Sequence, residues 1–410
     1  MTELLIENIR ALDPGRGEIA SALLIREGRI AAFDPPPPQT QHISRVDGGG
    51  RLLTPGLIDV HTHGIEQFSF EAGPDVLTKG LGRLGRYGVT SVLPTLYRVM
   101  EPKKLDELAA LATALNRCHD THVPGFHLEG PFLALPGAGA ATLNGDVALL
   151  DEIIAAANGR VASMSISPDT PQIVPVIEQL AERGIVVFMT HTRATAEQTR
   201  RAIDAGACHA THFYDVFPIP KETEPGVRPV GVVETVLADP QVSVDFIADG
   251  VHVDPTAILA ALAAKGYEGV ILITDANIGA GMPDGLYETA WGYPVKIQAG
   301  DAARIHQPTS PNHGHLAGSC LTMDLGMSNL LNWLPGTPEQ IWQLGTSNPA
   351  RLMTWHDKGT LRPGADADLV LWDVDPHHDH RLLAHRTWVA GTCVFERNGV
   401  NALNRSCGDS

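Results

Sequence analysis

The sequence predicts an α/β protein, a (β/α)8 TIM-like barrel with a small β-sandwich domain built from both termini. Between residues 57 and 274, short apolar runs that suit buried strands alternate with stretches of helical pattern, as in β/α units around a parallel sheet. There are eight such runs, the number of strands in a closed barrel of this kind. Both ends of the chain instead contain strand-like pieces without intervening helices, which indicates that they pair with each other.

The N-terminal segment is predicted to consist of short strands separated by Asp-Pro-Gly and Glu-Gly turns. These strands are expected at residues 4–6, 22–25, 29–33 and 43–53. Strand patterns return near the C-terminus, at residues 367–373 and 387–391. We therefore expect three parts, which are a small β domain from residues 1–54 and 358–400, a barrel over residues 55–357, and a polar tail at residues 401–410 without an assigned role.

The eight barrel strands are predicted from runs rich in Val, Ile and Leu. They are expected at residues 57–60, 89–94, 123–128, 161–166, 185–190, 207–211, 242–247 and 270–274. Helices between them are expected at residues 102–117, 171–183, 194–205 and 254–265. After the last strand, residues 276–319 are rich in Gly, Pro and polar residues, which predicts an active-site loop or hairpin excursion. Residues 321–334 and 338–344 are again predicted helices.

Composition excludes several classes of partner. The chain has 410 residues, 43% of them hydrophobic and 19% charged, which is ordinary for a globular protein with a large core. Its formal net charge of −17 argues against nucleic acid or an anionic membrane as partner, although it does not forbid an anionic small-molecule substrate. No apolar run is long enough for a membrane span, and the N-terminus lacks the basic start of a signal peptide. The five cysteines are scattered, which favours a reducing, cytoplasmic location.

The first barrel strand ends in the sequence Asp59-Val60-His61-Thr62-His63. Successive residues of a strand point to opposite faces, so His61 and His63 project from the same side. Two neutral imidazoles on one face can bind one divalent cation. The alternative is a pair of hydrogen-bonded histidines at the end of a strand.

Polar side chains also follow four other predicted strands. These residues are Glu129, His191, His212 and Asp275. In a (β/α)8 barrel the carboxyl ends of all strands meet at one rim, so we expect these side chains to share a metal site with His61 and His63. Imidazoles and carboxylates suit Zn²⁺ or Fe²⁺, as one or two ions, and can leave a position open for water. A carboxylate beside that water could move its proton to a leaving amine, and Asp275 is the candidate for this role.

With these residues in place, the chain resembles the amidohydrolase superfamily, and within it the N-acetylglucosamine-6-phosphate deacetylase group. The matching stretches span nearly the whole chain. They are residues 55–64, 125–133, 211–214, 248–253, 273–276, 316–324, 348–351 and 359–370. The resemblance implies a metal-bearing barrel, hydrolysis of an acetamide and a homodimer.

The resemblance also implies roles for individual residues. His61 and His63 would hold one metal, Glu129 would ligate or bridge, and His191 and His212 would complete a second position. Asp275 would be the general acid/base, and His252 matches a histidine that touches the sugar. Many members of the superfamily bridge two metals with a carboxylated lysine on the fourth strand. Residues 161–167 contain no lysine, which supports Glu129 as the protein carboxylate.

Three positions depart from the pattern of the deacetylase group. Ala141 stands where a histidine polarises the amide carbonyl, Asp215 begins the pair that in the group is Asn-Ala and contacts phosphate, and Thr223 replaces the phosphate-binding arginine. Asp215 would repel a phosphate, and losing a charged hydrogen bond costs about 1.5–3 kcal/mol. Candidate replacements, each equally interpretable as an exposed loop residue, are Arg228 or Lys221 for the phosphate and His306, His313 or His315 for the carbonyl.

The sequence therefore predicts a metal-dependent deacetylase of an N-acetyl amino sugar, with phosphate recognition left open. His252, Asp215 and Arg228 are its candidate substrate contacts. One alternative is an amidohydrolase that acts on a non-phosphorylated or non-sugar N-acyl compound. An alternative of another class is a non-catalytic barrel that keeps a metal in a structural or regulatory role.

Overall fold

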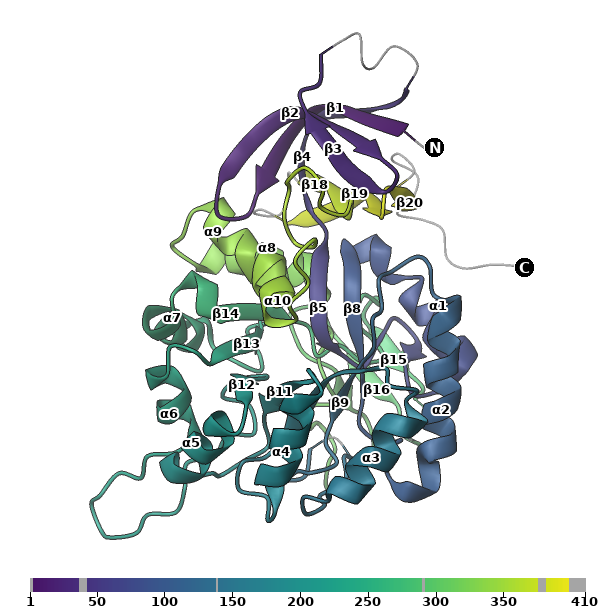
Figure 1. The fold of residues 1–410 in the computed structure, drawn as a ribbon. Coiled ribbons are helices and arrows are strands. Elements are labelled where there is room, and N and C mark those ends of the chain that lie inside the picture. The colour runs from purple at the N-terminus through teal and green to yellow at the C-terminus, as the bar shows by residue number, and fades with distance from the viewer. Residues whose placement is uncertain (1–2, 37–42, 138, 290–291, 375–380, 398–410) are drawn as a thin grey trace.

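The computed structural model describes residues 3–36, 43–137, 139–289, 292–374 and 381–397. Its largest feature is a barrel of eight parallel strands (Figure 1). In chain order the strands are β5 (Leu57–Thr62), β8 (Val89–Leu96), β9 (Phe126–Glu129), β10 (Val161–Ile166), β11 (Val186–Met189), β12 (Ala207–Ala210), β13 (Ser243–Ile247) and β14 (Val270–Ile273). Each pairs with the next in sequence order, and β14 also contacts β5, which brings the barrel close to closure. The predicted fold class and all eight predicted strands are confirmed.

The barrel strands are apolar because both of their faces are covered. All residues of β5, β8 and β14 are buried, since the interior of the barrel lies on one side and the outer helices lie on the other. The outer helices of the barrel units are α1 (Pro74–Leu81), α2 (Leu105–Ala114), α3 (Val147–Ala156), α4 (Ile173–Glu182), α5 (Ala196–Asp204), α6 (Val232–Ala238) and α7 (Pro255–Lys265). The helix predicted over residues 102–117 is α2 extended by a 3-10 turn at each end.

Several helices begin where the side chain preceding them satisfies free backbone N–H groups. Asp146 accepts hydrogen bonds from two backbone amides at the start of α3, and Asp254 does the same for one amide of α7. Thr195 and Gln198 form a reciprocal capping box at the start of α5. Local sequence thus fixes these helix starts.

The two ends of the chain form a second, seven-stranded sheet. Its order is β20-β19-β18-β4-β1-β2-β3. The strands are β1 (Glu3–Asp13), β2 (Gly17–Arg26), β3 (Arg29–Phe33), β4 (Ser44–Pro55), β18 (Leu369–Val374), β19 (Leu382–Val389) and β20 (Thr392–Glu396). The antiparallel pairing of β4 with β18 joins the two termini, as expected. The predicted tail at residues 401–410 lies outside the described residues.

Gly56 is the single residue between β4 of the small sheet and β5 of the barrel. A Cβ at this position would lie 2.1 Å from Thr90 Oγ1, so only glycine allows the close passage of the chain. Because β4 leads directly into the amino end of β5, the carboxyl ends of the parallel barrel strands point away from the small sheet (Figure 1).

The chain after β14 forms an excursion and then three helices. Residues 276–319 form the expected excursion, which contains the small strands β15 (Gly285–Tyr287), β16 (Val295–Ile297) and β17 (Arg304–Ile305). The short hairpin of β6 (Gly64–Ile65) and β7 (Phe68–Ser69) lies beside it, since the backbone of Glu66 pairs with Gly279 and Ala280. Then follow α8 (Met323–Trp333), α9 (Pro338–Trp342) and α10 (Ser347–Leu352).

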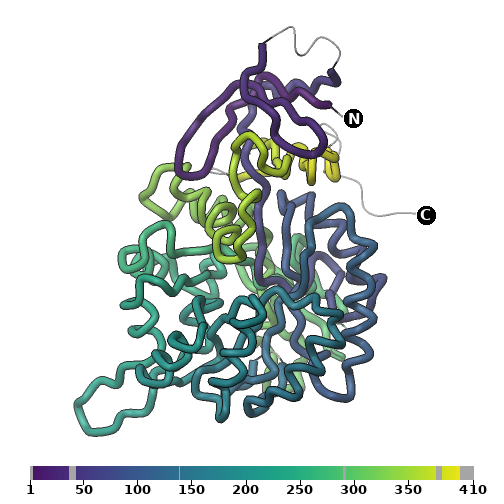
Figure 2. The backbone as a smooth tube through the Cα atoms, viewed as in Figure 1, coloured from purple at the N-terminus to yellow at the C-terminus, as the bar shows by residue number. Residues whose placement is uncertain are grey.

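The segment between β12 and α6 projects from the body of the molecule (Figure 2). It exposes the apolar side chains of Ile219, Val227 and Val230. Over the part of the chain that the structure describes, no helix combines the length and the apolar character needed to cross a bilayer.

Candidate metal centre

The six residues expected at the rim of the barrel all lie at or just beyond the carboxyl ends of strands. His61 is in β5 and His63 follows it closely, and Glu129 is the last residue of β9. His191, His212 and Asp275 each come two residues after a strand and are preceded by a threonine. These three residues have positive φ angles of 47°, 36° and 46°. Non-glycine residues rarely adopt this backbone conformation, and such strain concentrates at functional sites.

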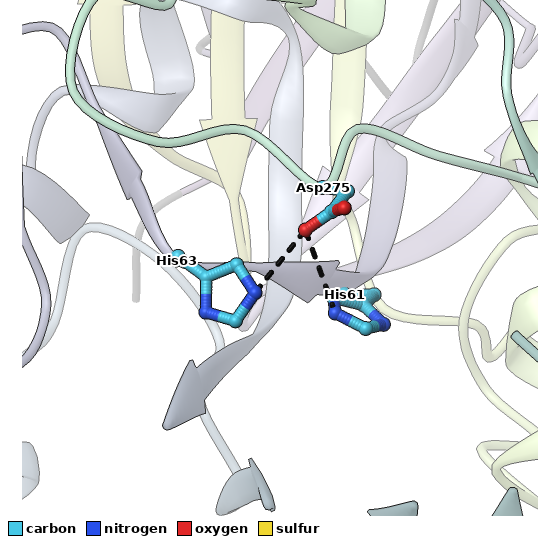
Figure 3. Close-up of side chains that lie close together, drawn as sticks. All are labelled: His61, His63 and Asp275. Atoms are coloured by element: carbon cyan, nitrogen blue, oxygen red, sulfur yellow. Dashed lines mark ion pairs between the residues drawn. The ribbon is translucent and has the colours of Figure 1, made fainter. Parts of the chain in front are cut away.

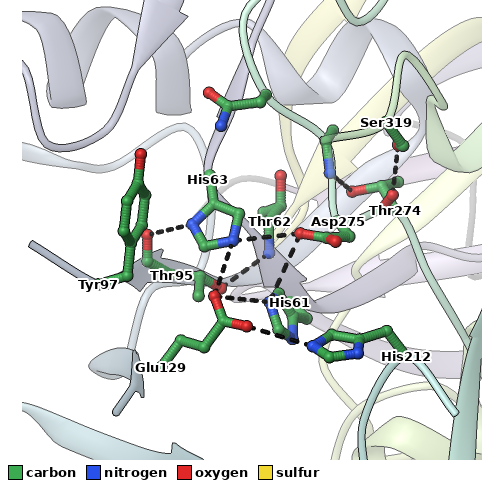
Figure 4. A network of polar contacts seen from close by, with 12 residues as sticks. His61, Thr62, His63, Thr95, Tyr97, Glu129, His212, Thr274, Asp275 and Ser319 are labelled. Carbon is green, nitrogen blue, oxygen red and sulfur yellow. Dashed lines mark hydrogen bonds and ion pairs between the residues drawn. The ribbon is translucent and has the colours of Figure 1, made fainter. Parts of the chain in front are cut away.

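The structure brings the six side chains together although they are up to 214 residues apart in sequence (61 to 275). Asp275 Oδ1 lies 3.1 Å from His63 Nε2 and 3.6 Å from His61 Nε2 (Figure 3). Glu129 joins the two halves of the cluster (Figure 4). Its Oε2 lies 3.2 Å from His63 Nε2, and its Oε1 lies 3.0 Å from His191 Nε2 and 3.2 Å from His212 Nε2.

This set of donors fits a divalent cation. Two groups of residues each offer three ligand atoms that lie within 4.8 Å of one another. One group is His61, His63 and Asp275, and the other is His61, Glu129 and His212. His61 belongs to both groups, and its Nε2 is buried and has no hydrogen-bond partner among the described residues. A buried nitrogen without a partner is costly, and a cation bound between the two groups would satisfy it.

The charges of the cluster support the same conclusion. Burial by itself would lower the pKa of His63, but hydrogen bonds with Asp275 and Glu129 raise it to about 10. His212 behaves alike, since Glu129 raises its pKa to about 10 against the effect of burial. Burial raises the pKa of Glu129, but its four histidine neighbours bring it well below the ordinary value. The buried carboxylates are therefore stabilised by positive charge beside them, which either protons on the imidazoles or a metal ion can supply.

Backbone carbonyls orient two of the imidazoles. His63 Nδ1 lies 3.2 Å from the carbonyl oxygen of Thr95, and His212 Nδ1 lies 3.3 Å from that of Asp215. A carbonyl only accepts hydrogen bonds, so in the neutral ring the hydrogen is on Nδ1 and the lone pair of Nε2 faces the cluster. The ring of Tyr97 packs edge-on against His63 at 5.0 Å between centroids.

His191 is held differently. Its Nδ1 is buried without a hydrogen-bond partner among the described residues, whereas Nε2 contacts Glu129. Gly137, in the loop after β9, lies directly against the ring, because a Cβ built on Gly137 would lie 1.8 Å from His191 Cε1. The loop therefore approaches His191 as closely as a glycine permits.

The three candidate substrate contacts have different surroundings. The side chain of His252 is only 4% exposed, and its Nδ1 lies 2.7 Å from Asp249 Oδ2. Burial lowers its pKa, but Asp249 and, from further away, Asp275 and Asp215 raise it above the ordinary value. The carbonyl oxygen of Asp215 lies 3.3 Å from Nδ1 of the cluster residue His212. By contrast, the side chain of Arg228 is 73% exposed and pairs with Glu234 on α6.

The three histidines considered as carbonyl partners lie in the excursion after β14. The rings of His306 and His313 pack against each other at 5.4 Å between centroids, and His315 is exposed. His313 Nδ1 also accepts a hydrogen bond from the backbone of Gln307. These contacts are local to the excursion.

Sequence reasoning missed the polar residues behind the cluster. Asp59 Oδ2 accepts a hydrogen bond of 2.6 Å from Thr274, next to Asp275, and Asp245 Oδ1 accepts one of 3.2 Å from Thr211, next to His212. Two signals were available. An aspartate interrupts each of two apolar strands, and a threonine precedes three of the strand-end residues.

Comparison with known proteins agrees with this fold and site. The sequence profile of the amidohydrolase family matches residues 52–400. The chain therefore belongs to the amidohydrolase family, and it is a hydrolytic enzyme that acts on an amide bond.

The particular relatives are deacetylases of N-acetyl sugar phosphates. The chain is 30% identical over 414 residues to N-acetylglucosamine-6-phosphate deacetylase of Lysinibacillus sphaericus, covering 96% of this chain and 98% of the relative. It is 33% identical over 380 residues to N-acetylgalactosamine-6-phosphate deacetylase of Escherichia coli O157:H7, covering 90% and 93%. It also resembles a solved structure of a mutant N-acetyl-D-glucosamine-6-phosphate deacetylase from Mycobacterium smegmatis in complex with N-acetyl-D-glucosamine-6-phosphate, with a TM-score of 0.79, 27% identity and coverage of 96% and 100%.

Proposed function

We propose that this chain is a metal-dependent deacetylase of an N-acetyl amino sugar. The observation that carries the proposal is the convergence of four imidazoles and two carboxylates at the carboxyl ends of the barrel strands. The three relatives described above, whose names specify deacetylation of an amino sugar phosphate, support the substrate class.

In this proposal His61, His63, Glu129, His191 and His212 hold one or two divalent cations, zinc or iron. When bound there, such a cation lowers the pKa of water and polarises the amide carbonyl. The protein's own contribution begins with Asp275. Burial raises the pKa of Asp275, but its hydrogen bond with His63 and the charges of His61 and His63 bring it below the ordinary value. Asp275 is therefore ionised at neutral pH and ready to accept a proton.

Asp275 would take the proton of the attacking water and deliver it to the amide nitrogen. A bond forms between the water oxygen and the carbonyl carbon, the bond from that carbon to nitrogen breaks, and the products are acetate and a free amine. His252, whose Nδ1 is held by Asp249, has Nε2 available for the carbonyl oxygen or the sugar. A cytoplasmic homodimer, as the sequence leads us to expect, completes the proposal.

Asp215 bears on whether the sugar substrate is phosphorylated. Its charge raises the pKa of both His212 and His252, and its carbonyl oxygen lies 3.3 Å from His212 Nδ1. A negative charge there disfavours a phosphate and would suit the hydroxyl groups of an unphosphorylated amino sugar. Arg228 does not offset this charge locally, because it pairs with Glu234.

The test is acetate release by the zinc-loaded or iron-loaded enzyme. The substrates are N-acetylglucosamine-6-phosphate, N-acetylgalactosamine-6-phosphate, the two unphosphorylated sugars and a set of N-acetyl amino acids. Release from either pair of sugars supports the proposal, and the faster pair decides whether phosphate is recognised. Release from the amino acids alone would replace the sugar by a non-sugar N-acyl substrate. No release from any substrate by a protein of full metal content would overturn the proposal.

A further inference from the structure

A chain of buried polar side chains runs beneath the cluster, across three barrel strands. It starts at Ser243 and passes through His209, Asp245 and Thr211 to His61, and every hydrogen bond after the first is buried. Except for Ser243, at the start of β13, these residues are fully buried. The interior of a barrel is normally filled by apolar side chains, so these polar groups need a reason to be there.

Asp245 determines the direction of the hydrogen bonds in this chain. Its Oδ1 accepts a hydrogen bond from the backbone N–H of His212 and lies 3.2 Å from Thr211 Oγ1, and its Oδ2 lies 2.7 Å from His209 Nε2. An ionised carboxylate has no hydrogen to donate. The hydroxyl hydrogen of Thr211 must therefore point toward Asp245.

The orientation of the Thr211 hydroxyl in turn determines the state of His61. Thr211 Oγ1 lies 2.9 Å from His61 Nδ1. With its hydrogen directed at Asp245, this oxygen presents a lone pair to Nδ1 and can only accept. The hydrogen of the neutral imidazole is then on Nδ1, and the lone pair of Nε2 faces Asp275 and Glu129.

His61 differs in this respect from His63 and His212. Their Nδ1 atoms face backbone carbonyls, which accept hydrogen bonds whatever surrounds them. A hydroxyl can donate as well as accept. Without Asp245, Thr211 could donate to His61 Nδ1, and the hydrogen on the ring would then sit on Nε2 and block a cation.

We propose that Thr211 and Asp245 are positioning residues that hold His61 in the tautomer able to bind a metal ion through Nε2. The inference rests on the metal site of the proposed function. It does not depend on which substrate the enzyme uses, because it concerns binding of the metal to the protein. Partners behind metal-binding histidines commonly change metal affinity by about 10- to 100-fold when they are removed.

The experiment measures the affinity of the metal-free full-length protein for Zn²⁺ by competition with a chromophoric chelator, without substrate. Thr211→Val removes the hydroxyl at nearly constant shape, and Thr211→Ser retains it. We expect Zn²⁺ to bind about 10- to 100-fold more weakly to Thr211→Val, and to Thr211→Ser with the affinity of the unchanged protein. Asp245→Asn, which can donate to Thr211, should weaken binding as well.

Thr235→Val is the matched control. Thr235 Oγ1 is also buried and donates a hydrogen bond of 2.7 Å, to the carbonyl of Gly231, but it lies on α6 outside the barrel. Should Thr211→Val fail to fold, Thr211→Ala provides a second variant without the hydroxyl. Unchanged Zn²⁺ affinity in the hydroxyl-free variant, or an equal loss in Thr235→Val, would overturn the proposal. Normal Zn²⁺ behaviour in an enzyme that releases no acetate would instead count against the proposed function.

Discussion

Replacing Asp275 by asparagine tests the centre of the proposed mechanism. Asparagine keeps the size of the side chain but can neither carry the charge nor accept the proton of the attacking water. General acid–base groups typically contribute 10²- to 10⁴-fold to a rate, which corresponds to about 3–5 kcal/mol of activation free energy. We therefore expect acetate release to fall by two to four orders of magnitude.

The structure limits the cost of this substitution to the folded state. Asp275 makes one short contact with the cluster, 3.1 Å to His63 Nε2, whose loss costs about 1.5–3 kcal/mol. Glu129 Oε2 remains 3.2 Å from the same nitrogen, and the substitution also removes the repulsion between the two carboxylates. A folded domain has about 5–15 kcal/mol of stability, so the variant should stay folded.

The assay follows acetate release at several pH values, with metal content determined on the same samples. Asp254→Asn is the control, because Asp254 is an exposed cap of α7 and asparagine is an equally good cap. Turnover of Asp275→Asn equal to that of the control, at equal metal content, would remove Asp275 from the mechanism. A rate lost only in proportion to lost metal would reassign it as a ligand without a proton-transfer role.

Three further predictions concern the loop over the cluster, a buried carboxyl and the metal. Gly137→Ala should displace His191 and weaken Zn²⁺ binding, whereas Gly82→Ala, with helical φ and no atom nearer than 3.5 Å to the added Cβ, should not; equal affinities would contradict this. Burial raises the pKa of Asp324 to about 6, so the folded state favours the protonated carboxyl. The resulting contribution to stability is present at low pH and is lost as pH rises from about 4 to about 6. At pH 7, Asp324→Asn should therefore increase the free energy of unfolding by up to about 3 kcal/mol, measured by denaturant unfolding, and this increase should shrink toward pH 4. An increase that does not change with pH would refute the raised pKa of Asp324. Removing the metal with a chelator should lower the melting temperature, since a ligand at about 100 times its Kd stabilises by about 2.7 kcal/mol, and an unchanged melting temperature would argue against a site in the folded protein.

The sequence alone determined the architecture, for an identifiable physical reason. Strands buried on both faces must be apolar throughout, so the eight barrel strands stand out as runs such as Val270–Ile273. Parallel strands also share one direction, so every residue that follows a strand end is carried to the same rim. These two rules were enough to predict that His61 and Asp275 share a site although they are 214 residues apart in sequence (275 minus 61).

Only the tertiary structure decided which groups touch within that rim. The central place of Glu129, the contact of Gly137 with His191 and the exposure of Arg228 depend on loop paths and side-chain rotamers that no local pattern specifies. The same holds for Thr211, whose hydroxyl reaches His61 across 150 residues. Hydrogen bonds are short and directional, so a few tenths of an ångström decide whether such groups meet, whereas the burial of an apolar strand tolerates that uncertainty.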